Sequence, residues 1–70
     1  MNIIYQLGMR IRYLRKAKKM SQLDLALEAD INRNYLSDLE KGRRNPTILI
    51  LNKIAIALNI DLATLFKGIQ

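Results

Sequence analysis

The sequence contains no cysteine and no histidine. These absences exclude disulfide bonds, thiol chemistry and the usual ligands of a zinc site, so we expect no metal and no cofactor. No segment approaches the run of ~20 apolar residues that a membrane span needs. The first ten residues lack the positive region and apolar block of a secretory signal, so a cytoplasmic protein with no membrane contact is expected.

Acidic residues are also scarce. Six Asp and Glu face twelve Lys and Arg, which gives a net charge of +6 and a pI near 10.1. Such an excess favours a polyanionic partner, either nucleic acid or an acidic membrane surface, although a basic protein without one has the same composition. Half of the 70 residues are apolar, which is ample for the core of one small domain, residues 1–70.

Catalytic side chains are nearly missing as well. With neither histidine nor cysteine, the one candidate acid/base pair is Asp24 and Glu28. Their spacing is ordinary for the solvated face of a helix. We therefore expect no enzymatic activity.

The segment 21–40 has the pattern of two short helices joined by a tight turn. Ser21 is a strong N-cap candidate, and Asp24 can complete a capping box with it. Asp30 tolerates the left-handed conformation that the turn needs, because its short polar side chain can bond locally. Asn32 can then cap the second helix.

The second of these helices has distinct inward and outward faces. Tyr35, Leu36 and Leu39 are expected to face the core. The residues that should face solvent are polar or charged: Arg33, Asn34, Ser37, Asp38 and Lys41. A short helix that offers Arg and Asn in its first turn is suited to probing the edges of DNA bases.

Helical periodicity also covers the rest of the chain. A first helix is predicted for Ile3–Lys18, and Gly8 within it indicates either a later helix start or a closely packed partner. Thr47 should cap a helix running to about Leu58, whose inner row is Ile48, Leu51, Ile54, Ala55 and Leu58. Asp61 should cap a last helix, Leu62–Lys67. With no strand pattern, the fold class is all-α, with five helices.

The strings SQLDLA, YLSDLEKGRRNPT and KIA resemble the lambda-repressor/Cro-type helix-turn-helix domain, also called the Xre family. The likeness covers about residues 8–66, and it departs at Asp30, where the family usually has glycine. It implies a lambda-repressor-like bundle whose second and third helices form the helix-turn-helix. NRNYLSDLEKGRRNPT is also similar to controller proteins of restriction–modification systems, although simple phage and chromosomal regulators carry near-identical strings.

The resemblance implies a transcriptional regulator that binds double-stranded DNA with its third helix in the major groove. The positions implied to contact bases are Arg33, Asn34, Ser37, Asp38 and Arg44. Those implied to contact the DNA backbone are Gln22, Tyr35, Lys41, Arg43, Asn45 and Arg10. Asp38 has a second interpretation: its carboxylate can instead tether Arg33 or another basic side chain.

The resemblance further implies an ion pair between Arg15 and Glu40, which would join the first helix to the end of the third. A homodimer reading two half-sites is also expected. The apolar residues available for its interface are Leu49, Ile50, Ile56, Leu62, Leu65, Phe66 and Ile69. The alternative function is a protein-interaction module, such as an antitoxin or a coactivator-like adaptor, with the apolar C-terminal surface as its working face.

Overall fold

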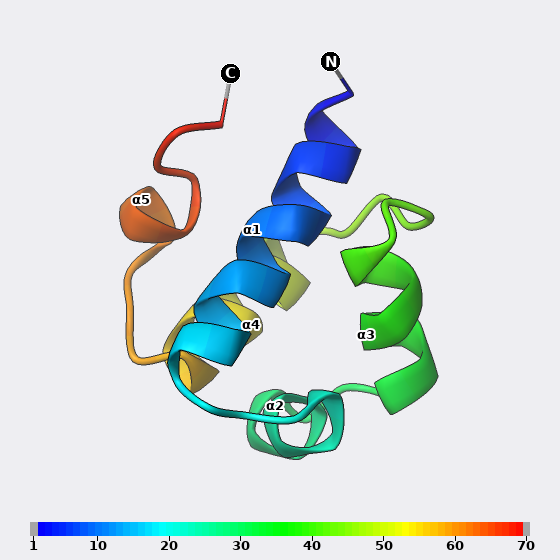
Figure 1. Cartoon of the computed structure of the whole chain (residues 1–70), viewed down its shortest axis with the longest axis vertical. Helices are drawn as coiled ribbons and strands as arrows, with labels where there is room; N and C mark the ends of the chain where they lie inside the picture. Colours follow the sequence, from blue (N-terminus) through cyan, green and yellow to red (C-terminus); the bar gives the residue numbers. More distant parts are fainter. Residues whose placement is uncertain (1, 70) are drawn as a thin grey trace.

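A computed structural model describes residues 2–69 and shows five helices, with no strand in that part of the chain (Figure 1). The helices are α1 (Ile3–Ala17), α2 (Gln22–Ala29), α3 (Arg33–Glu40), α4 (Ile48–Ala57) and α5 (Leu62–Leu65). The predicted all-α fold is confirmed. The first and last positions of the predicted domain, residues 1 and 70, lie outside the described residues.

The predicted helix caps are present. Ser21 accepts a hydrogen bond from the Asp24 amide, and the Asp24 carboxylate accepts one from the Ser21 amide. This second bond stabilises the charged carboxylate and lowers the pKa of Asp24. Asp30 adopts the left-handed conformation (φ 55°, ψ 50°), and the Asn32 side chain caps α3. The sharp turn between α2 and α3 is thus built from local side-chain chemistry.

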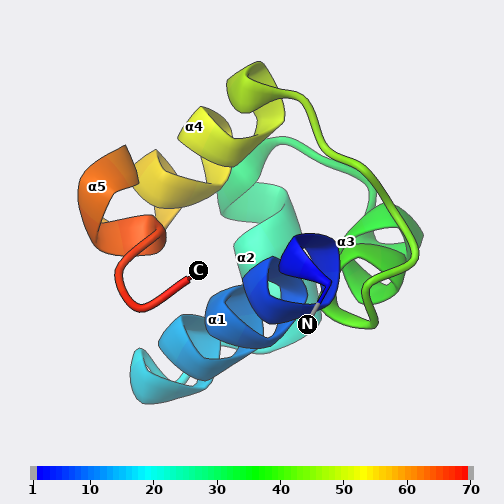
Figure 2. The same cartoon turned by 90° about the horizontal axis from the view of Figure 1, so that it is seen from above.

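The core lies where the helices pack on one another: α1 and α2 on α3, α2 on α4, and α4 on α5 (Figure 2). Its largest fully buried side chains are Ile11, Leu25, Leu36, Leu39, Ile54, Leu58 and Leu65. Each of the five helices contributes at least one of these residues, and Leu58 directly follows α4. Among residues 2–69, no helix has the length and apolarity to cross a bilayer.

Three predictions for the C-terminal half are wrong. Ile48 is 64% exposed rather than inward-facing, because it begins α4 beside the exposed Thr47 and Leu49. Helix α5 ends at Leu65 rather than Lys67: the Phe66 amide still bonds Leu62 four residues back, but the Lys67 amide bonds Thr64 only three residues back. Leu65 itself is fully buried within the subunit, so it belongs to the core and not to an exposed dimer surface.

Candidate nucleic-acid interface

Helix α3 is held close to α1 at Gly8. A Cβ atom added at Gly8 would overlap the carbonyl oxygen of Leu39 and would lie 3.0 Å from that of Glu40. Of the two interpretations of this glycine, the closely packed partner is therefore correct, and α1 is regular on both sides of it. The contact fixes the distance between α1 and the C-terminal end of α3.

The structure brings Arg15 and Glu40 together in a second link between the same helices. The Arg15 guanidinium donates to both carboxylate oxygens of Glu40, at 2.7 and 2.9 Å. Their side chains are only 8% and 3% exposed. Arg15 also donates to the carbonyl of Met20, and Gln22 donates to Glu40 at 3.1 Å. The end of α3 is thus tied to α1 and to the start of α2.

The opposite side of α3 is open. Arg33, Asn34 and Lys41 are exposed, while Ser37 and Asp38 are half-buried beside them. Because these positions follow helical spacing, the candidate base-contacting residues share one face of a helix whose other face is locked in the core. A rigidly held polar helix face of this size can enter the major groove of DNA.

Arg44 lies against this face. Its guanidinium is 3.6 Å from the Asp38 carboxylate, and it stacks 5.2 Å from the centre of the Tyr35 ring. Asp38 therefore tethers a basic side chain, as its second interpretation stated. The side chains of Arg44 and Asp38 are 52% and 35% exposed, so this pair adds little stability. Arg43 and Asn45, on either side of Arg44, are exposed.

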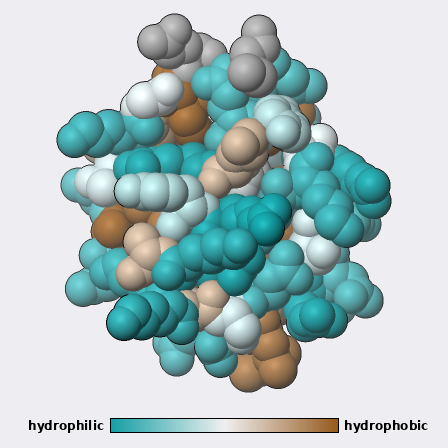
Figure 3. All heavy atoms as spheres, in the orientation of Figure 1, coloured by the Kyte–Doolittle hydropathy of each residue, from teal (hydrophilic) through white to brown (hydrophobic). Residues whose placement is uncertain are grey.

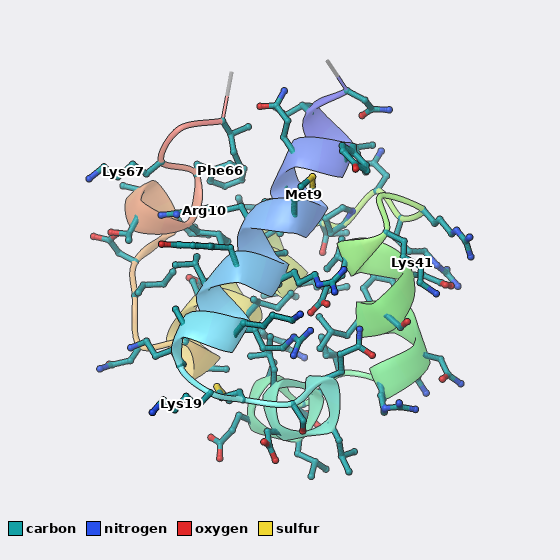
Figure 4. All side chains as sticks on the ribbon, in the orientation of Figure 1. Met9, Arg10, Lys19, Lys41, Phe66 and Lys67 are labelled. Carbon is teal, nitrogen blue, oxygen red and sulfur yellow. The ribbon has the colours of Figure 1, made fainter. Side chains whose placement is uncertain are left out.

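Arg10 has a different environment from the other candidate DNA contacts. It donates to the carbonyls of Thr64 at 2.9 Å and Leu65 at 3.4 Å, and it lies over the Tyr13 ring. Figure 4 shows it reaching from α1 toward α5, whereas α3 lies on the other side of α1. Arg10 thus hydrogen-bonds the backbone at the C-terminal end of α5. Sequence spacing could not reveal these bonds, because the partners lie more than 50 positions away.

Residues 11–65 match the family model described as helix-turn-helix. The chain belongs to this family. Control protein C.MunI of a Mycoplasma species is 37% identical over 99% of the chain and 95% of its own length. The immunity repressor protein of Bacillus phage phi105 is 40% identical over 58 residues, which are 83% of the chain but only 40% of the repressor.

Solved structures of other helix-turn-helix proteins superpose closely. The restriction-modification controller protein C.AhdI from Aeromonas hydrophila has a TM-score of 0.88 and 38% identity, covering 90% of the chain and 96% of its own. The controller protein C.Esp1396I, as a tetramer in complex with its natural 35 base-pair operator, has a TM-score of 0.90 and 29% identity, covering 99% and 91%. The fold assigned above is therefore shared with restriction-modification controller proteins, one of which was solved on its operator.

Proposed function

We propose that the chain is a sequence-specific transcriptional regulator of the controller-protein kind, which binds a pseudo-palindromic operator as a homodimer. The observation that carries this proposal is the arrangement of α3: buried links at Gly8 and Glu40 fix one side, and Arg33 and Asn34 are exposed on the other. The relatives support it, since they are named as repressors and control proteins. They do not favour the adaptor alternative.

We assign base recognition to the first turn of α3. An Arg33 guanidinium can bond guanine O6 and N7 together, and an Asn34 amide can bond adenine N6 and N7. Ser37 lies one turn further along the same face. Asp38 pairs with Arg44. We therefore propose that Asp38 orients Arg44 toward the bases and does not contact a base itself.

The DNA backbone is assigned to residues around this face. Lys41, Arg43 and Asn45 are exposed, and Tyr35 is half-buried beside Arg44. The Gln22 amide nitrogen carries two hydrogens, and Glu40 accepts one of them, so the other can meet a phosphate at the start of α2. Arg10 is not included among the DNA backbone contacts, because its guanidinium hydrogen-bonds the Thr64 carbonyl of α5.

Selection of bound sequences from a random DNA pool tests the function. The 70-residue chain should enrich one motif with two-fold symmetry, whose half-sites are centred about one helical turn apart. Enrichment of no sequence, with retention of duplexes in proportion to their abundance, would contradict sequence-specific regulation.

Two arginines should affect binding in different ways. Arg33→Ala should relax the preference at one base position by about 1–3 kcal/mol, because it removes a base contact. Arg43→Ala should weaken all duplexes alike and reduce the slope of log affinity against log salt by about 1, because it removes a phosphate contact. Affinities for the selected site and its single-base variants, at several salt concentrations, separate the two effects. Identical profiles for both variants would contradict the assignment.

We assign the dimer interface to the apolar surface of α4 and α5. Leu49 and Ile56 are strongly exposed, and Ile50, Leu62, Phe66 and Ile69 are half-buried. Exposed apolar residues of this size on one helix favour a protein interface. With Leu65 assigned to the core, these six residues are the proposed contact.

Ile56→Asp should dissociate the dimer and lower operator affinity while leaving the fold intact, because Ile56 is 68% exposed in the subunit. Sedimentation at several concentrations measures the association. The matched control is Leu23→Asp, which places the same charge at an exposed leucine of α2. Loss of association in both variants, or in neither, would count against the α4–α5 interface.

A further inference from the structure

Helix α1 carries a second row of apolar side chains that faces away from the core. Tyr5, Met9 and Tyr13 recur at every fourth position, and all three are exposed. Figure 4 shows Met9 projecting from the outward side of α1. Side chains with this spacing lie above one another on one face of a helix. The row is therefore a continuous apolar ridge, which the DNA-reading function described above leaves without a use.

A hollow of about 500 Å³ lies beside this ridge, between α1 and the C-terminal end of α3. The ridge residues form its apolar lining, and Arg12, Lys16 and Lys41 supply positive charge around it. Figure 3 shows this face as a mainly hydrophilic surface interrupted by pale and brown patches. The hollow thus combines a hydrophobic floor with a cationic rim, which we call the α1 groove.

Within residues 2–69, no ion pair joins a carboxylate to Arg12, Lys16 or Lys41 of the α1 groove. Its one lining carboxylate is Glu40, and both oxygens of Glu40 already accept hydrogen bonds from Arg15. The positive rim therefore selects an anionic partner. Phosphates alone would match Arg12, Lys16 and Lys41, but they would leave Met9 and the two tyrosine rings in water.

An amphipathic helix with an acidic margin matches both features, because its apolar face covers the ridge while its carboxylates meet the cations. From the ridge, the hollow and the unpaired rim, we propose that the α1 groove docks an acidic amphipathic helix of a partner protein. This proposal does not rest on DNA reading, since Arg33 and Asn34 lie at the opposite end of α3. Of the rim residues, only Lys41 is also assigned to the DNA backbone, and Arg12 and Lys16 belong to the groove alone.

The probe is a fluorescein-labelled synthetic peptide with leucines at positions i, i+3, i+4 and i+7 and glutamates flanking them. Its anisotropy is measured with the full 70-residue chain, without DNA. A peptide of the same composition with a shuffled order is the first control, and a lysine-for-glutamate version is the second. The acidic amphipathic peptide should bind at least about tenfold more tightly than either control, and its affinity should fall with salt.

Met9→Asp places a negative charge in the floor of the groove, and it should weaken binding of the acidic peptide by at least about tenfold. Leu27→Asp is the matched control, because it makes the same change at an exposed position of α2, and it should leave peptide binding unchanged. Thermal melts establish that both variants fold. Both should also retain affinity for random-sequence duplex DNA.

Several results would overturn the proposal. Equal binding of the ordered and shuffled peptides would exclude helix docking, and equal losses in Met9→Asp and Leu27→Asp would exclude this site. A parallel loss of duplex binding in Met9→Asp alone would assign the groove to DNA. Loss of self-association in Met9→Asp alone would assign it to a second copy of the chain.

Discussion

Replacing Glu40 with alanine is expected to lower the free energy of unfolding by about 3–5 kcal/mol, because the change strands a buried guanidinium. Arg15 would keep its bond to the Met20 carbonyl but lose both bonds to the carboxylate. Gln22 would lose its partner as well. A domain of this size has a total stability of only about 3–5 kcal/mol from a single small core, so the variant should be largely unfolded near room temperature.

Urea unfolding followed by circular dichroism measures this effect. Asp38→Ala is the control on the same helix, since its partner Arg44 is half in solvent, and it should cost less than about 1 kcal/mol. The double variant Arg15→Leu with Glu40→Leu should recover much of the loss, because it removes the stranded charge together with its partner. Equal stabilities for Glu40→Ala and Asp38→Ala would refute the buried pair as the link between α1 and α3.

Replacing Gly8 with alanine is expected to destabilise the protein by about 1–3 kcal/mol or more, as overpacking of a close contact does. The sign of this change in the free energy of unfolding is what distinguishes the two explanations of Gly8. In an exposed helix interior, alanine stabilises relative to glycine by about 1 kcal/mol. Here the added methyl group meets the backbone carbonyl of Leu39, which cannot move without shifting α3.

The same variant should also impair DNA binding, because a displaced α3 would no longer present Arg33 at its native angle. Lys16→Ala is a suitable reference, since it adds alanine at an exposed position of the same helix. Unfolding curves and operator affinities for the two variants separate packing from helix propensity. A Gly8→Ala variant more stable than the native protein would show that α1 and α3 are not in contact at this point.

Sequence patterns predicted the features that depend on a few neighbouring residues. The capping box at Ser21 and Asp24 and the cap at Asn32 are built from side chains three positions apart or closer. The left-handed Asp30 was also predicted, because its position between two helical patterns leaves the chain few other ways to turn. These features follow from hydrogen bonds between residues that are close in the sequence, so the residue types alone predict them.

The features that were missed depend on how distant helices meet. Nothing near Arg10 in the sequence indicates that its guanidinium bonds the end of α5. The apolar spacing of α4 treats Ile48 like Leu51, although only Leu51 is buried. Leu65 was likewise grouped with Leu62 and Phe66 as an interface residue, because one helical turn is too short to define an inner face. Tertiary packing decides each of these positions.

Base reading by the outward face of α3 is tested most directly by mapping the backbone amide chemical shifts that change when the selected duplex binds. We predict that the largest changes occur in the first turn of α3, at Arg33 and Asn34, and in residues 43–45. The amides of α5 should change little. Large shifts around α5, with the amides of α3 unchanged, would contradict base reading by α3.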